Sequence, residues 1–259
     1  MKLKSRVITL IENFRAVFYA PFYAAVALGA YRQEGLEVII KTSTDPASTV
    51  HFLLSGQGEV SWGGPLRLMF TLEKNPVSQA VAFCEVVGRD PFFLVGRVRN
   101  PTFRLEDLAG KRVATVSEVP TPWMCLQHDL RRAGIDPSKI DRTPDGLMAD
   151  NAAALRAGQV DVIQVFEPFA AQLEAEAAGH VWYAAASRGP ASYTTLNTTR
   201  GFLEENPDVA LRMCRALYRT QKWIAARDGR DLAKVVGSYF PDLSSAVLAS
   251  SFDGYRAPS

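Results

Sequence analysis

The stretch Leu155-Arg-Ala-Gly-Gln-Val-Asp-Val-Ile-Gln-Val-Phe-Glu-Pro-Phe169 reads as a helix end, a tight turn, a strand and a new helix start. Gly158 falls where the C-terminus of a helix favours a residue that tolerates positive φ. The apolar, β-branched run from Val160 to Val165 is typical of a strand buried on both faces of a parallel sheet. The stretch therefore predicts an α/β fold.

Glu167 comes just after this predicted strand, and Pro168 suits the first position of the following helix. Open α/β sheets bind ligands at the carboxyl ends of their strands, so Glu167 is a candidate ligand contact. The alternative is that Glu167 only caps the next helix, since acidic residues are favoured at helix N-termini. The spacing supports the two interpretations equally.

The same alternation of short apolar strands and helices extends in both directions along the chain. Helices are expected at 21–33, 46–55, 66–72, 123–133, 147–157 and 169–178, with a helical tail after Arg200. Strands are expected at 6–11, 36–40, 60–62, 77–87, 92–96, 112–116, 140–143, 160–165, 181–184 (at a sheet edge) and 192–197. This alternation indicates α/β architecture with parallel strands.

Two turns, Gly88–Pro91 and Arg188–Ala191, split the chain into comparable α/β halves. The helical tail is expected to fold back on the first half, and two chain crossings between two lobes would suit a hinge. The alternative is one continuous sheet in which these turns are ordinary loops. Composition does not separate these two architectures.

Composition excludes some classes of protein. The 259 residues are enough for a large core, and the net charge of +2 with no basic block argues against a nucleic-acid partner. The three histidines have no neighbours at metal-ligand spacing, so no metal and no other cofactor is expected. The three cysteines form no zinc or redox motif, and buried structural thiols are expected at Cys84, Cys125 and Cys214.

The N-terminus has some features of a secretory signal, because basic residues precede apolar ones. Glu12, Arg15 and Pro21 interrupt this pattern, and the apolar stretch 16–30 is too short for a membrane span. The sequence as it stands therefore predicts no export signal. Either such a signal was removed, or the protein stays in the cytoplasm.

Several blocks, spread over most of the chain, resemble those of one family and keep its order. They are PFYAAVALGAYRQEGLEV at 21–38, LSGQGEVSWGG at 54–64, LEDLAGKRV at 105–113, ALRAGQVD at 154–161 with FEPF at 166–169, and FLEENP at 202–207. On these residues the chain is similar to the SsuA/THI5 (NMT1-like) family of periplasmic substrate-binding proteins of ABC importers. Members of that family usually continue with more helix and strand beyond the region that ends here at Ser259.

This resemblance implies an α/β protein with the periplasmic-binding-protein type II fold, in which two lobes are joined by a two-strand hinge. Lobe one is expected to comprise 1–90 plus 191–259, and lobe two 91–190. The resemblance also implies a monomer that captures a small polar or aromatic ligand between its lobes. Its partners would be the permease and ATPase subunits of an ABC importer. A periplasmic location follows from the resemblance, and a cytoplasmic one if the gene starts at Met1.

In such a fold the ligand lies between strand ends and helix N-termini, where free N–H groups favour anions and polar rings. Loop residues with aromatic rings, absent side chains, hydroxyls or charges are the candidates. Each has a simpler structural alternative as core, turn or helix cap. The expected ligand contacts are Asn13, Phe18, Tyr19, Gly63, Gly64, Arg89, Ser117, Glu118, Thr121, Glu167 and Tyr193.

Glu167 also bears on the class of ligand. A buried carboxylate facing the ligand disfavours a sulfonate, because like charges repel in a dry site, and it favours a ring amine. The aromatic residues between 14 and 19 agree with this preference, since flat rings stack on aromatic faces. An aminopyrimidine related to the thiamin precursor is therefore favoured, with a sulfonate or nitrate next.

The competing function is an enzyme on the same fold that acts on a sulfur or pyrimidine compound. Yeast-type pyrimidine synthases carry an iron-binding cysteine motif and a donor histidine, but residues 64–68 here contain no histidine. Aryl-sulfinate desulfinases share a fragment like that around His51, but their cysteine would fall in the loop 13–16, which has none, and Ser61 replaces their arginine. An enzyme would need Cys84, the one cysteine near the predicted cleft. A cytoplasmic ligand sensor is a third interpretation.

Overall fold

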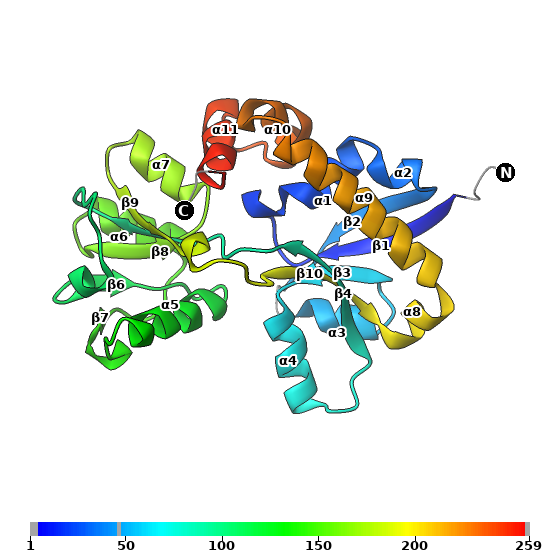
Figure 1. Cartoon of the computed structure of the whole chain (residues 1–259), viewed down its shortest axis with the longest axis horizontal. Coiled ribbons are helices and arrows are strands. Elements are labelled where there is room, and N and C mark those ends of the chain that lie inside the picture. Colours follow the sequence, from blue (N-terminus) through cyan, green and yellow to red (C-terminus); the bar gives the residue numbers. More distant parts are fainter. Residues whose placement is uncertain (1–4, 46–47, 257–259) are drawn as a thin grey trace. The chain divides into compact units, whose positions relative to one another are not determined.

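The computed structural model describes residues 5–45 and 48–256 and divides the chain into two compact units (Figure 1). Unit 1 comprises the described residues up to Arg89 together with Ala191–Phe252. Unit 2 comprises Asp90–Pro190 together with the described residues from Asp253 on. The chain therefore passes from one unit to the other three times.

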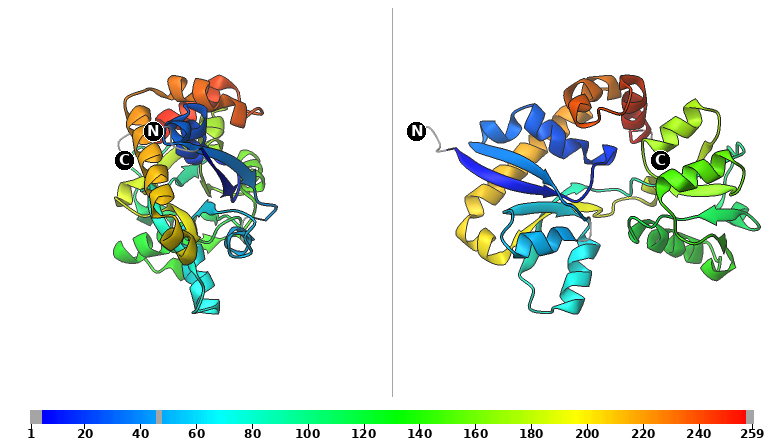
Figure 2. Two further views of the ribbon diagram at one scale, coloured as in Figure 1. Left: turned by 90° about the vertical axis from the view of Figure 1, so that its right-hand side faces the viewer. Right: turned by 180° about the vertical axis from the view of Figure 1, so that it is seen from behind.

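Unit 1 is built on a mixed five-stranded sheet in the order β2-β1-β3-β10-β4. Strand β1 pairs in parallel with β2, beside which it lies in Figure 2, and with β3, whereas β10 runs antiparallel to both β3 and β4. The strands are β1 (Arg6–Glu12), β2 (Leu36–Thr42), β3 (Val60–Gly63), β4 (Ala80–Val87) and β10 (Thr194–Thr199).

The long helix α9 (Pro207–Ala225) packs against α1 (Ala20–Ala27) and α2 (Ala30–Gln33), as Figure 1 shows. One helix was expected over 21–33, but Gly29 divides it into α1 and α2 because it adopts a φ of +68°, which right-handed helices do not allow. The remaining helices are η1 (Val17–Tyr19), α3 (Thr49–Leu54), α4 (Pro65–Lys74), α8 (Arg200–Glu205), α10 (Gly229–Val236), η6 (Gly237–Tyr239) and α11 (Ser245–Gly254), whose last residues belong to unit 2.

Unit 2 has a second mixed sheet in the order β7-β6-β8-β5-β9. Strand β6 pairs in parallel with β7 and β8, and β5 runs antiparallel to β8 and β9. The expectation of an edge strand at 181–184 is confirmed by β9. The strands are β5 (Phe93–Gly96), β6 (Arg112–Ala114), β7 (Asp141–Arg142), β8 (Val162–Val165) and β9 (His180–Ala184).

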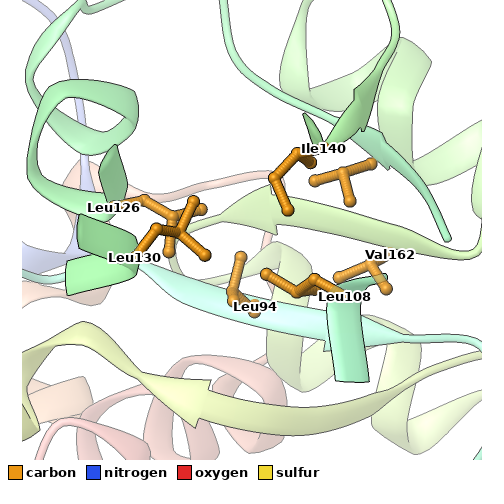
Figure 3. Close-up of a cluster of buried hydrophobic side chains, with 7 residues drawn as sticks. Leu94, Leu108, Leu126, Leu130, Ile140 and Val162 are labelled. Carbon is orange, nitrogen blue, oxygen red and sulfur yellow. The ribbon is translucent and has the colours of Figure 1, made fainter. Parts of the chain in front are cut away.

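The core of unit 2 lies between this sheet and the helix α5 (Thr121–Arg132). Figure 3 shows leucines of β5 and α5 pointing toward Ile140 and Val162. The other helices of the unit are η3 (Leu105–Leu108), η4 (Pro137–Lys139), α6 (Met148–Arg156), α7 (Phe169–Ala175) and η5 (Ala185–Arg188). In residues 5–45 and 48–256, every helix is too short or too polar to cross a membrane.

The expectation of parallel strands is wrong for β5 and β10. Both strands follow a passage of the chain from one unit to the other, and each inserts into its sheet antiparallel to its neighbours. All four residues of β5 are buried, like those of the parallel strand β8. An apolar run reveals that a strand is buried, but it does not reveal the direction in which the strand runs.

The C-terminal end also differs from expectation. Residues 191–259 were expected to join the first lobe, but the described residues from Asp253 on belong to unit 2. There the ring of Tyr255 stacks on Phe93 with centroids 5.8 Å apart, and its hydroxyl accepts a hydrogen bond from the Glu167 N–H at 3.0 Å. A short segment after a helix carries no periodicity that would reveal such a contact.

Three smaller expectations concern a helix start, the cysteines and His51. The helix start expected at Pro46 lies outside the described residues, and α3 begins at Thr49. The three cysteines, expected to be buried, are each half-buried and free. His51 lies on the exposed side of α3.

Candidate functional site

The loop that follows β1 holds its polar groups in contacts of its own. Asn13 is buried, and its side-chain amide donates to the Tyr19 hydroxyl at 2.9 Å while its carbonyl oxygen accepts from the Phe14 N–H at 2.9 Å. These bonds close the loop on itself. Asn13 therefore shapes this loop, whatever else it contacts.

The expected stacking residues form an aromatic cluster in unit 1. The rings of Phe18 and Tyr19 lie 4.2 Å apart, and Tyr19 lies 5.5 Å from Trp62. Tyr193 meets Phe18 edge-on at 6.0 Å. Phe18 and Tyr19 are buried, and burial raises the pKa of the Tyr19 hydroxyl. The core alternative for Phe18 matches this packing, and Tyr193 is the half-buried member of the set.

The glycine pair that follows β3 brings three segments of unit 1 together. A Cβ at Gly64 would lie 3.2 Å from the carbonyl oxygen of Tyr193, so this glycine allows close approach of two backbones. A Cβ at Gly63 would lie 3.8 Å from Cδ of Arg67 and 3.9 Å from Nδ2 of Asn197. The pair therefore lies between the start of α4 and the strand β10.

Arg67 is a site residue that the sequence analysis missed. It is half-buried in the first turn of α4, and burial lowers its pKa, while the Tyr19 and Tyr193 hydroxyls and Asp45 act in the opposite direction. Among the described residues its guanidinium has no hydrogen-bond or ion-pair partner within bonding distance. A cation in the first turn of a helix faces the positive end of the helix dipole, and this unfavourable position was the available signal.

Strand β10 adds buried polar groups beside the glycines. The Thr195 hydroxyl donates to Oδ1 of Asn197 at 2.7 Å and also lies 3.3 Å from the carbonyl oxygen of Gly63. Both side chains are buried in the middle of the sheet. A central strand made mostly of threonine and asparagine is unusual, and its composition was a signal that the sequence analysis did not use.

In unit 2, the expected residues Ser117 and Glu118 lie in the loop between β6 and α5. Thr121 is the first residue of α5, and Ser117 is exposed. One oxygen of Glu118 accepts from the Met148 N–H at 2.9 Å, and this bond ties the loop to the first turn of α6. The other oxygen is buried and accepts no hydrogen bond from the described residues.

Glu167 follows the neighbouring strand β8 and is buried. Its Oε2 accepts from the Ala171 N–H at 2.9 Å, so the carboxylate caps the first turn of α7. Its Oε1 would lie 2.8 Å from a Cβ placed on Gly254. The capping alternative therefore describes the geometry of Glu167. Because β6 and β8 are parallel neighbours, Glu167 and the Ser117–Thr121 loop lie at the same edge of the sheet.

The first passage between the units carries Arg89, which is exposed, and Asp90, which is buried. Asp90 accepts hydrogen bonds from the Phe92 N–H and from Arg188 at 3.0 Å each. The expected residues thus form one group per unit. In unit 1, hydrogen-bond and ring contacts link Asn13, Phe18, Tyr19 and Tyr193, and Gly63 and Gly64 lie beside Arg67 and Tyr193. In unit 2, Ser117, Glu118, Thr121 and Glu167 lie at one edge of the sheet. Arg89 belongs to neither group.

A family model described as NMT1/THI5 like matches residues 17–228 of the chain. The chain is 27% identical over 251 residues to the putative binding protein YtlA of Bacillus subtilis, covering 96% of this chain and 75% of YtlA. It is 24% identical over 151 residues to the 4-amino-5-hydroxymethyl-2-methylpyrimidine phosphate synthase of Legionella pneumophila, covering 58% of this chain and 46% of that enzyme.

Among solved structures, the periplasmic aliphatic sulphonate binding protein SsuA of Escherichia coli superposes with a TM-score of 0.71 at 19% identity. The alignment covers 97% of this chain and 84% of SsuA. At this identity the likeness concerns the fold alone. It confirms the expected type II fold of periplasmic binding proteins.

Proposed function

Because the chain belongs to the NMT1/THI5-like family, we propose that it is a solute-binding protein that captures a small organic ligand for an ABC importer. Its expected partners are then the permease and ATPase of that importer, and it acts outside the cytoplasm as a monomer. The similarity to the binding protein YtlA over nearly the whole chain supports this proposal. The ligand contacts proposed are the two groups of residues described above, one in each unit.

The class of ligand is inferred from Arg67. The Arg67 guanidinium is half-buried and forms no ion pair with the described residues, so the Asp45 carboxylate and the Tyr19 and Tyr193 hydroxyls offset only part of its desolvation. An acidic group on the ligand would supply the missing charge and accept two parallel N–H bonds, which is the geometry that arginine favours. The proposed ligand is therefore a small organic anion, such as a sulfonate, a carboxylate or a phosphate ester, with nitrate as an inorganic counterpart.

The preference for an aminopyrimidine rested on Glu167, and the capping bond to α7 removes part of that support. A carboxylate that already accepts the Ala171 N–H has less capacity for a ligand amine. The aromatic cluster of unit 1 still favours a flat ring. A phosphorylated aminopyrimidine would satisfy both the rings and Arg67, so this compound class stays in the proposal beside the sulfonates.

The enzyme alternative has one specific observation in its favour, the similarity to the pyrimidine phosphate synthase over 58% of the chain. Against it, residues 64–68, where a donor histidine would be expected, contain Arg67 and no histidine. Cys84, the candidate nucleophile, lies half-buried on β4, and its thiol donates to the carbonyl oxygen of Glu85 at 3.6 Å. Complete Cys84 alkylation without loss of ligand binding would argue against this alternative.

A thermal-shift screen tests the proposal. The panel holds alkanesulfonates, nitrate, aromatic acids, thiamin and aminopyrimidines with and without a phosphate group. Saturation at about 100 times the Kd adds about 2.7 kcal/mol of stability. We expect a shift with a compound that carries an acidic group, and we expect Arg67→Gln to abolish it.

The matched control is Arg200→Gln, which removes an exposed arginine on α8 of the same unit and should leave the shift unchanged. A shift with neutral aminopyrimidines that survives Arg67→Gln would contradict the anionic ligand class while supporting a binding protein. A panel without any shift would count against the binding function for these ligand classes and would favour the enzyme.

A further inference from the structure

Strands β3 and β10 of unit 1, which lie side by side in Figure 1, share a buried polar face beside the glycine pair. Ser61 of β3 lies opposite Asn197 of β10, and Gly63 lies opposite Thr195. Residues two apart point to one face of a strand, and residues opposite each other on paired strands share a face, so these four positions lie on the same face. The three polar side chains among them are buried, and burial of a polar group costs free energy unless the group is hydrogen-bonded.

The side-chain amide of Asn197 uses only its acceptor in these contacts. Its Oδ1 accepts from the Thr195 hydroxyl at 2.7 Å, and this bond fixes Nδ2 as the donor end of the amide. Among the residues that the structure describes, no acceptor lies within hydrogen-bond distance of Nδ2. The Ser61 hydroxyl is buried and is likewise without a partner in the described part of the chain. This face therefore holds two hydrogen-bond donors that the described residues leave unused.

Arg67 reaches the same face from α4. Only Gly64 separates β3 from this helix, and Arg67 lies in its first turn. Side chains of a helix lean toward its N-terminus, so that of Arg67 extends back toward the end of β3. A Cβ on Gly63 would lie 3.8 Å from Cδ of Arg67 and 3.9 Å from Nδ2 of Asn197. The absent side chain of Gly63 therefore leaves space for a small group between Arg67 and Asn197.

The groups around this space favour a negatively charged occupant. The Arg67 guanidinium is a cation that forms no ion pair with the described residues, and Nδ2 of Asn197 is a second N–H donor. An acidic group can accept hydrogen bonds from both, and such bonds to an anion are stronger than bonds to a neutral acceptor. An amino group in the same place would meet a cation and a donor, and both contacts are unfavourable.

We propose that the acidic group of the ligand lies over Gly63, where it accepts hydrogen bonds from Nδ2 of Asn197 and from the Arg67 guanidinium. This inference rests on the proposed function and deepens it, because it names the point of unit 1 that receives the acid. It also makes Asn197 a residue that determines specificity. Thr195 is then a positioning residue, since its hydroxyl holds the amide of Asn197 with the donor end free for the ligand.

Asn197→Asp tests the donor, because the two side chains have the same shape but the carboxylate accepts where the amide donates. The probes are benzenesulfonate, benzoate and phenyl phosphate, with benzenesulfonamide as the uncharged counterpart, and calorimetry measures their Kd. We expect the Kd of the three acids to rise about 10- to 100-fold, the effect of losing one hydrogen bond to a charged group. Benzenesulfonamide, whose NH2 group can donate to the new carboxylate, should bind the variant at least as well as the parent. Asn75→Asp makes the same change at an exposed position of unit 1 and is the matched control.

Gly63→Ala tests the space. The added methyl group would keep ordinary contact distances of 3.8 Å and 3.9 Å, so the variant should fold and melt like the parent in the absence of a probe. Because the methyl group fills the position of the acid, we expect the Kd of the three acids to rise about tenfold or more. Gly201→Ala on α8, where no atom lies within 4 Å of the new Cβ, is the control and should leave the Kd unchanged.

Two results would overturn this inference while leaving the proposed binding function in place. The first is that the acids bind the parent and both variants with the same Kd, since the acidic group would then lie elsewhere. The second is that Asn197→Asp weakens benzenesulfonamide as much as benzenesulfonate, which would show that Asn197 supports the site without selecting charge. A parent protein that binds none of the three acids would instead contradict the anionic ligand class of the proposed function, and this inference with it.

Discussion

Arg188 lies between two buried carboxylates of unit 2, Asp90 and Asp129. Its guanidinium donates to both, and Tyr183 donates its hydroxyl to Asp129 at 3.0 Å. Burial nevertheless raises the pKa of Asp90 above its ordinary value of 3.8, in spite of the neighbouring arginine. The charged form of Asp90 is therefore less favourable in the folded protein than in the unfolded chain.

This raised pKa predicts a pH dependence with a definite sign. A carboxyl group whose folded pKa is raised contributes its stability fully below about pH 3.8 and loses it as the pH rises through the folded value. Asp90→Asn removes this titration, so the variant should gain stability relative to the parent as the pH increases above about 4. Urea denaturation of both proteins across this range measures the difference.

Asp242→Asn, at an exposed position, is the control and should show no such trend. A difference between Asp90→Asn and the parent that stays constant or moves the other way with pH would show that Asp90 is not titrating as its burial implies.

At the level of single elements, the first turn of α7 allows a test of the two interpretations of Glu167, as a helix cap and as a ligand contact. The bond from the Ala171 N–H satisfies one of the free donors of the first helical turn. A glutamine at this position keeps a carbonyl oxygen that can accept the same bond, whereas an alanine does not. The two substitutions therefore separate a structural role from a role in binding.

We expect Glu167→Ala to lower the free energy of unfolding by about 0.5–2 kcal/mol, the range measured for lost helix caps. Glu167→Gln should cost less, because its amide oxygen still accepts the bond. Chemical denaturation measures both. If Glu167→Gln keeps full stability but loses binding to the ligand found in the thermal-shift screen, the carboxylate also contacts that ligand, as the sequence analysis proposed.

At the scale of the whole molecule, the third passage of the chain gives unit 2 a segment from the far end of the sequence. Tyr255 stacks on Phe93 of β5, and its hydroxyl is the acceptor for the buried N–H of Glu167. Unit 2 is therefore completed only when the end of the chain is in place. Its integrity depends on residues that follow Phe252 in the sequence.

A chain that ends at Phe252 should consequently lose stability in unit 2 and not in unit 1. Hydrogen exchange should speed up in β5 and at the start of α7, while β1 and β3 keep their protection. Tyr255→Phe is the finer test. It leaves the Glu167 N–H without an acceptor and should cost about 1–3 kcal/mol. Equal loss of protection in both units would contradict this division of the chain.

Sequence patterns alone were enough to predict the α/β class, most strands and helices, the family and the loops that carry the candidate residues. These features depend on local periodicity, on glycine and proline at element ends, and on motifs contained in one segment, such as 155–169. The carboxyl-end position of Glu167 belongs to this group. Its capping bond was one of two alternatives that the spacing left open.

Other features became visible only in the folded chain: the antiparallel direction of β5 and β10, the return of Tyr255 to unit 2, and the position of Arg67, whose guanidinium forms no ion pair with the described residues. Each depends on segments that are distant in the sequence and meet only after folding. The order of apolar and polar residues along the chain predicts whether a position is buried, because burial depends on hydrophobicity. This order does not predict which segment packs against a buried position, because many distant segments would supply an equally apolar or polar surface.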